Sequence, residues 1–200
     1  PDFLPRQECV ILFDELANAL PATQTACQRI VLDRSSDGGW VAHPRTLICA
    51  ASNRRTDRCG VNSMPASLDN RLVHLEVKPD VSFWTSWLLS TYSTTQAERD
   101  ASAVIVSYLS WRGDHAYKFD ADAVQKGNHG CPTFRSWEGV GKLLIAGYES
   151  WSGEVLHAMI KGTIGIGVGT EFVTFLRLKD KLPDIDGILA GKPWTVPDAP

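Results

Sequence analysis

The sequence predicts an α/β fold with a parallel sheet, followed by a mainly α-helical domain. Apolar runs rich in β-branched residues alternate with helix-forming stretches over residues 1–78, which is typical of a parallel sheet. Amphipathic stretches with helical spacing replace these runs over residues 79–178. Prolines recur over residues 179–200, which indicates a linker or a tail.

The predicted sheet begins with the apolar run "CVILF" (9–13), which has the pattern of a strand buried on both faces. Pro21 can occupy the first turn of a helix, and good helix formers continue to Arg34. The segments "TLICAAS" (46–52) and "LVHLEV" (72–77) then have the composition of a second and a third strand.

Polar residues stand beside each predicted strand. Asp14 and Glu15 follow the first strand, Asn53 follows the second, and Arg71 precedes the third. Ligands of parallel α/β sheets collect at the carboxyl ends of the strands, so we expect Asp14, Glu15 and Asn53 near a ligand. One carboxylate could hold a hydrated Mg²⁺ beside a nucleotide while the other positions an attacking water.

The helical domain is predicted from four amphipathic stretches. They are "SFWTSWLLSTY" (82–92), "AERDASAVIVSYLSW" (97–111), "SWEGVGKLLIAG" (136–147) and "TEFVTFLRL" (170–178). This part of the sequence therefore predicts a smaller, mainly helical domain.

Composition excludes several functional classes. The formal net charge of −3 gives no global basic field for nucleic acid or anionic lipid. No apolar run approaches the roughly 18 residues that a membrane span requires. The five cysteines form no C-x-x-C pair, which is typical of reduced thiols, so we expect a cytoplasmic protein without a membrane segment.

The order of these motifs resembles AAA+ ATPases of the MoxR-like branch over nearly the whole chain. The matching segments are "VILFDE", "AASN", "SLDNRLVHLEV" and "CPTFRSWEGV". By this resemblance Asp14 and Glu15 correspond to the Walker B pair, Asn53 to the sensor-one residue, Arg71 to the arginine finger, and Arg135 to the sensor-two arginine. The fold class implied is a partial P-loop NTPase core followed by a lid.

The resemblance implies ATP binding and hydrolysis that remodels a partner protein. Asp14 would hold Mg²⁺, Glu15 would polarise the attacking water, and Asn53 would help to place it. Arg71 would reach a neighbouring subunit's nucleotide, and Arg135 would report the γ-phosphate to the lid. A trans arginine requires a homo-oligomeric ring, expected to be a hexamer, and such ATPases often act with von Willebrand factor A-domain proteins.

The sequence departs from the family pattern in three places. Phe134 replaces the proline usual before the arginine, and Ser52 replaces the glycine usual before the asparagine. No segment fits the phosphate-binding loop G-x-x-x-x-G-K-[ST], since "EGVGKLL" (138–144) lacks the first glycine and "GTIGIGVGT" (162–170) lacks a lysine. We therefore expect that loop upstream of Pro1, and this fragment to be inactive alone.

Simpler interpretations remain open for each site residue. The Asp14–Glu15 pair could cap the helix that follows, and Asn53 could be a turn residue. Arg71 could be a surface ion-pair partner, or Arg135 could lie over the ring of Trp137.

Alternative identities also remain for other segments. The nearby Arg54, Arg55 and Arg58 compete with Arg71 for the role of finger. His129 and Cys131 have the spacing of metal ligands, although a zinc site needs about four. The stretch "NRRTDR" (53–58) could indicate a nucleic-acid-binding protein. The main alternative function is a non-catalytic assembly or adaptor module that keeps the AAA+ fold without turnover.

Overall fold

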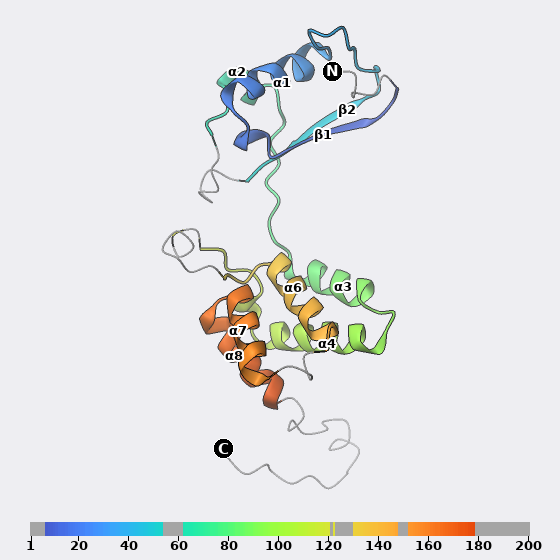
Figure 1. Ribbon diagram of the computed structural model, residues 1–200. Coiled ribbons are helices and arrows are strands. Elements are labelled where there is room, and N and C mark those ends of the chain that lie inside the picture. The colour runs from blue at the N-terminus through green and yellow to red at the C-terminus, as the bar shows by residue number, and fades with distance from the viewer. Residues whose placement is uncertain (1–6, 54–61, 121, 123–129, 148–151, 179–200) are drawn as a thin grey trace. The chain divides into compact units, whose positions relative to one another are not determined.

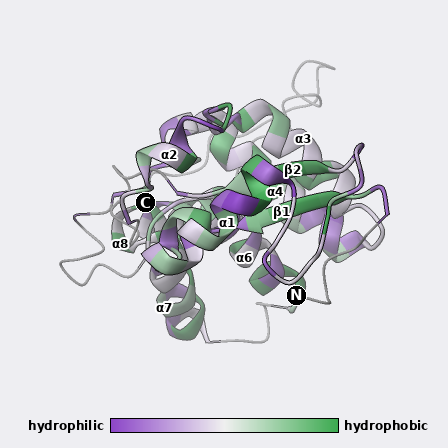
Figure 2. Ribbon diagram, turned by 90° about the horizontal axis from the view of Figure 1, so that it is seen from above, coloured by the Kyte–Doolittle hydropathy of each residue, from purple (hydrophilic) through white to green (hydrophobic). Residues whose placement is uncertain are grey.

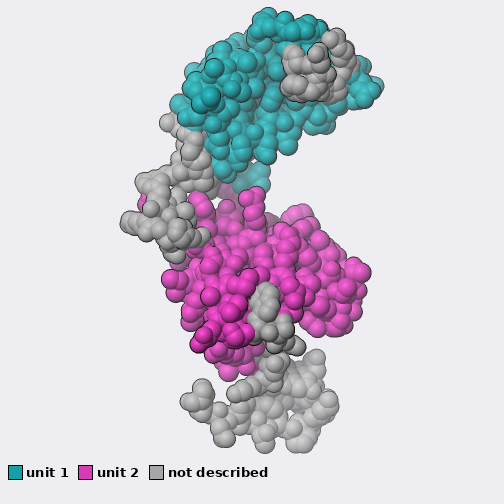
Figure 3. Space-filling model, in the orientation of Figure 1, with its two compact units in different colours: residues 1–77 teal, residues 78–200 magenta. Residues whose placement is uncertain are grey.

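The computed structural model describes residues 7–53, 62–120, 122, 130–147 and 152–178. The chain divides into two compact units, residues 1–77 (unit 1) and residues 78–200 (unit 2), which Figure 3 shows in different colours. The predicted tail at 179–200 lies outside the described residues.

Unit 1 is an α/β unit built on a small parallel sheet. Strand β1 (Val10–Asp14) pairs in parallel with β2 (Leu47–Ala51), in a register that sets Asp14 opposite Ala51. Helix α1 (Pro21–Asp33) connects the two strands (Figure 1). The first two predicted strands and the helix between them are confirmed, with Pro21 in the first turn of the helix.

The end of α1 is tied to the start of β2. Arg34 leaves the helix in the left-handed region at φ 53. Its guanidinium donates hydrogen bonds to the carbonyl of His43 at 3.1 Å and to the carbonyl of Thr46 at 2.6 Å. These contacts fix where β2 begins relative to the helix.

The sheet of unit 1 is covered on one face. Ile11 of β1 is buried against Trp40 and Ala42. Val10 and Leu12 point to the opposite face, where they are 66% and 59% exposed. The prediction of a strand buried on both faces is therefore wrong, because no described element packs over Val10 and Leu12.

The third predicted strand does not form. The sheet contains β1 and β2, and residues 72–77 have no strand assignment. Val73, Leu75 and Val77 are 89%, 84% and 90% exposed. A groove of about 830 Å³ is lined by β2 and by most of this extended segment. The alternating apolar pattern is present, but a strand also needs a neighbour with which to pair its backbone.

Unit 2 is helical. Its longer helices are α3 (Val81–Thr91), α4 (Gln96–Trp111), α6 (Phe134–Ile145), α7 (Gly153–Ile164) and α8 (Ile166–Leu178). The start of α3 is fixed by Asp80, whose side chain accepts the backbone N–H of Phe83. Thr95 and Glu98 form a capping box at the start of α4. The four predicted helical stretches are confirmed, whereas the sequence did not predict α7.

One connected core joins these helices. Its fully buried side chains include Ile105 and Tyr108 from α4, Trp137 from α6, Ile160 from α7 and Phe172 from α8. Figure 2 shows apolar and polar residues alternating along the helical ribbons, as expected when each helix buries one face. Helices α7 and α8 pack closely against each other and are separated by Gly165 alone.

Candidate functional site

The candidate site lies at the carboxyl ends of β1 and β2. Because the strands are parallel and in register, Glu15 after β1 and Asn53 after β2 leave the same edge of the sheet. The side-chain amide of Asn53 donates to the two Glu15 carboxylate oxygens at 3.3 and 3.5 Å. Two residues 38 positions apart in the sequence thus contact each other through polar groups.

Glu15 has an unusual backbone conformation. Its φ of 55° and ψ of 36° place it in the left-handed region, which a residue with a Cβ rarely adopts. It precedes the short 3-10 helix η1 (Leu16–Asn18) but makes no side-chain cap to that helix. The carboxylate of Glu15 is therefore not used as a helix cap.

Three amide side chains that the sequence did not indicate hold the turn after Glu15. Asn18 donates to the Glu15 carboxylate at 2.8 Å. The buried Gln24 donates to the carbonyls of Leu16, Ala17 and Ala19 at 3.1 to 3.4 Å. Asn62 donates from its backbone N–H to the Ala17 carbonyl at 2.8 Å and from its side chain to the Ala19 carbonyl at 3.1 Å.

Asp14 is the last residue of β1, and its side chain is exposed. Within the described ranges, no group of three or more His, Cys, Asp or Glu side chains could hold a metal ion. An exposed carboxylate beside open solvent nevertheless suits Mg²⁺, which usually keeps several waters and takes one or two protein carboxylates. The exposed carboxylate of Asp14 therefore suits a hydrated Mg²⁺.

Arg71 follows helix α2 (Ala66–Asp69). Its guanidinium donates to the carbonyl of Ser67, and no described carboxylate forms an ion pair with it. Arg71 and Asn53 both line the groove beside β2. The competing Arg54, Arg55 and Arg58 lie outside the described residues.

Arg135 is an exposed residue in the first turn of α6 in unit 2. Among the cation–π contacts of the described residues there is none between Arg135 and Trp137, so that interpretation is wrong. The Trp137 ring is instead buried, and its Nε1 donates to the carbonyl of His115 at 2.9 Å. Cys131 is free, and His129, its proposed companion in a metal site, lies outside the described residues.

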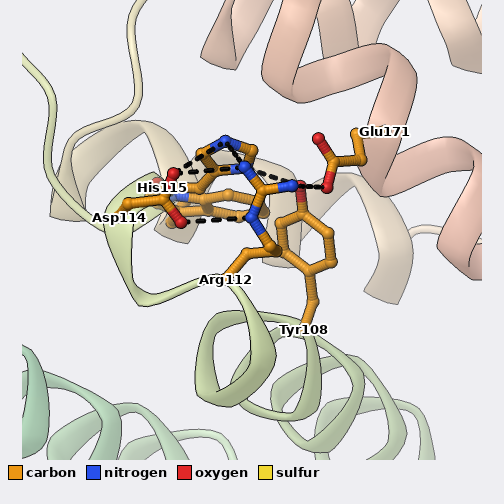
Figure 4. Close-up of polar contacts among 6 residues, drawn as sticks. Tyr108, Arg112, Asp114, His115 and Glu171 are labelled. Carbon is orange, nitrogen blue, oxygen red and sulfur yellow. Dashed lines mark hydrogen bonds and ion pairs between the residues drawn. The ribbon is translucent and has the colours of Figure 1, made fainter.

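A second polar cluster lies inside unit 2 and joins α4, the 3-10 helix η3 (Gly113–His115) and α8 (Figure 4). The Tyr108 hydroxyl lies 2.7 Å from Nδ1 of His115, and Arg112 donates to Nε2 of His115 at 2.9 Å. Arg112 also pairs with Asp114 and Glu171. Burial raises the pKa of Tyr108 well above its usual range. These contacts connect α4 and η3 with α8.

In the part of the chain that the structure describes, no helix combines the length and the hydropathy needed to cross a bilayer. Four described cysteines, Cys9, Cys27, Cys49 and Cys131, are free thiols. No family model, curated protein or solved structure matches the chain.

Proposed function

We propose that this chain is part of an AAA+ ATPase of the MoxR-like type, which binds and hydrolyses ATP to remodel a partner protein. The observation that carries the proposal is the contact between Asn53 and Glu15 across the carboxyl ends of two parallel strands. A carboxylate held by an amide at that edge suits the positioning of an attacking water.

Each site residue has a distinct role in the proposal. Glu15 accepts hydrogen bonds from, and so orients, the attacking water, and Asn53 fixes the direction of that carboxylate. Asp14 holds Mg²⁺ through water. Arg71 supplies positive charge to the nucleotide of the neighbouring subunit. Arg135, on the helical lid, supplies positive charge to the γ-phosphate. Mg²⁺–ATP, when bound, supplies the electrophilic phosphorus and the leaving group.

The phosphate-binding loop that this chemistry needs would come from polypeptide outside residues 1–200. Such a loop follows a strand and precedes a helix. Two features support a place for that strand beside β2. The outer edge of β2 has no strand partner in the described residues, and β2 and the segment 72–77 line a common groove. The proposal further includes a cytoplasmic homo-oligomeric ring, a hexamer, acting with a von Willebrand factor A-domain protein.

The test is a Glu15→Gln substitution in the polypeptide that carries the phosphate-binding loop. The amide keeps the size of the carboxylate but polarises water poorly, so ATP should remain bound while turnover falls about 10²–10⁴-fold. Glu154→Gln, at an exposed position on α7, is the matched control and should leave turnover unchanged. Phosphate release and retention of labelled ATP are the measurements. Normal turnover by the Glu15→Gln protein would contradict the proposal.

Subunit mixing tests the trans role of Arg71. Arg71→Ala subunits, inactive alone, should regain hydrolysis when mixed with Glu15→Gln subunits, because each supplies what the other lacks. A trans arginine contributes about 10³–10⁵ in turnover, so partial recovery is easily measured. If subunits exchange between rings and no ratio restores turnover, Arg71 is not the finger.

The absence of a phosphate-binding motif from residues 1–200 favours a second candidate, a non-catalytic assembly module. A longer gene product without that motif would oligomerise without hydrolysing ATP. The coding sequence preceding Pro1, together with an ATPase assay of its product, distinguishes the two functions.

A further inference from the structure

The turn that follows β1 is held in a strained conformation by contacts from three directions. Glu15 has a positive φ, which persists only where the surroundings fix it. The Asn18 backbone N–H closes the turn by donating to the Glu15 carbonyl at 2.9 Å. Ser52, at the end of β2, accepts the Ala17 backbone N–H at 2.9 Å. The turn is thus attached to the neighbouring strand.

Buried amides hold the other side of the turn. Gln24 is fully buried, and its single NH₂ group lies within hydrogen-bond distance of three turn carbonyls. Asn62 donates to the Ala17 and Ala19 carbonyls. These contacts fix the position of Asn18, because its own carbonyl also accepts from the Asn62 side chain at 3.4 Å.

Asn18 uses this fixed position to contact the Glu15 carboxylate. Its Nδ2 donates to Oε2 at 2.8 Å, the shortest of the three amide contacts, while the Asn53 amide approaches from the end of β2. A carboxylate that accepts hydrogen bonds from two amides on different elements has little freedom to rotate. Asn18 and Asn53 therefore hold the Glu15 carboxylate from two sides, and we call this pair of contacts the clamp.

The rest of the Asn18 side chain contributes nothing favourable to stability. Its Oδ1 is buried, and none of the described residues supplies a hydrogen-bond partner for it. A buried acceptor without a partner destabilises a fold, so an apolar residue of similar size would be tolerated better at this place. The favourable contact of Asn18 is therefore the one that its NH₂ group makes with Glu15.

We propose that Asn18 is a positioning residue, which with Asn53 holds the Glu15 carboxylate in the direction needed to orient the attacking water. This assignment rests on the proposed ATPase function. Asn18 does not touch the nucleotide in this scheme, and it acts through Glu15.

The clamp itself can be tested on residues 1–200 without nucleotide. In ¹⁵N spectra of the side-chain amides, Glu15→Gln should shift the signals of both Asn18 and Asn53. Asn18→Ala should shift the signal of Asn53, because the carboxylate that it contacts is released. Asn70→Ala removes an exposed asparagine at the end of α2 and is the matched control. An Asn53 signal that ignores both Glu15→Gln and Asn18→Ala would overturn the clamp.

The positioning role is tested by turnover in the polypeptide that carries the phosphate-binding loop. Asn18→Ala should lower kcat roughly 10-fold to 100-fold with little change in KM for ATP, since supporting contacts have effects of this order. Tm should change little, because the lost hydrogen bond to Glu15 is offset by removal of the buried acceptor. Asn18→Gln keeps the amide and should recover part of the rate.

A double substitution separates positioning from other roles. In a Glu15→Gln background, Asn18→Ala should cause no further loss of kcat, since the group that it positions is already absent. An additive loss of kcat in the double variant overturns the positioning role. If the wild-type protein shows no turnover while the variants show the expected spectral shifts, the ATPase function is overturned and the clamp is supported.

Discussion

At the scale of single residues, Glu138 of α6 shows how hydrogen bonds set the charge of a partly buried carboxylate. Lys142 lies 2.7 Å from its Oε1, and the Tyr92 hydroxyl donates to the same oxygen at 2.9 Å. These two contacts, Lys142 first, hold the pKa of Glu138 below its usual range. The contact between Tyr92 and Glu138 joins the end of α3 to α6.

We expect Tyr92→Phe to lower the free energy of unfolding by about 1 kcal/mol at pH 7, because one hydrogen bond to a carboxylate is lost. Since the folded pKa of Glu138 is lowered, its contribution is fully present above the unfolded pKa of about 4.3 and disappears as pH falls through the folded pKa. The difference between wild type and variant should therefore shrink in acid. Urea titrations between neutral and acid pH measure it.

Tyr117→Phe is the matched control, because Tyr117 is 43% exposed and makes an aromatic contact with Phe134 that phenylalanine keeps. Its free energy of unfolding should equal that of wild type at every pH. A Tyr92→Phe difference that stays constant down to strongly acid pH would show that Glu138 is not the group involved.

Sequence patterns indicated the residues of the candidate site that are charged or that follow a strand. They did not indicate the amide side chains that support these residues. Glu15 and Asn53 stand at strand ends, and parallel strands bring such ends together. Asn18, Gln24 and Asn62 carry no charge and belong to no motif. Their contacts depend on the left-handed turn at Glu15, a conformation that no residue preference predicts for glutamate.

At the scale of elements, two glycines of α8 have opposite surroundings. A Cβ added at Gly169 would lie 2.9 Å from the Lys161 Cα, which is backbone of α7 and cannot move aside. A Cβ added at Gly167 would meet nothing within 4 Å. The close approach of α7 and α8 therefore requires the absence of a side chain at Gly169.

We expect Gly169→Ala to destabilise unit 2 by about 1–3 kcal/mol, through overpacking of the two helices. Gly167→Ala should stabilise it by about 0.5–1 kcal/mol, because alanine loses less backbone entropy than glycine in a helix. Thermal unfolding followed by circular dichroism measures both variants. Equal effects of the two substitutions would contradict the helix contact.

Local patterns predicted most helices and two strands, and the exceptions have physical causes. Helix α7 contains Gly153 and Gly162 and is followed by Gly165, and these glycines obscure its helical signal. Its stability comes from packing, since Ile160 and Ile164 are fully buried. The alternating residues 72–77 had a strand pattern, but pairing depends on a distant partner that the pattern does not contain.

At the scale of the whole molecule, the two units differ in how much core they contain. Unit 2 has one continuous core drawn from all five of its longer helices. The described residues of unit 1 form two small clusters, centred on Trp40 and on Leu68. A domain can fold alone when its hydrophobic core is large enough. The core of unit 2 is larger than either cluster of unit 1, so unit 2 is the better candidate for independent folding.

We therefore expect residues 78–178, expressed alone, to unfold in one cooperative transition. Ile160→Ala in that segment should lower the free energy of unfolding by about 2–5 kcal/mol, as for a fully buried aliphatic residue. Urea denaturation followed by both tryptophan fluorescence and circular dichroism measures the transition. Two probes giving different midpoints would show that the segment lacks a single core.

In the part of the chain that the structure describes, no strand pairs with the outer edge of β2, which affects how the protein behaves at high concentration. A strand edge next to the exposed apolar side chains of Val73, Leu75 and Val77 is a template for pairing with another chain. Residues 1–77 at high concentration should therefore aggregate through intermolecular β-structure, seen as thioflavin T fluorescence. Replacing Val73 and Leu75 with lysine should delay this aggregation, because charged edges resist stacking.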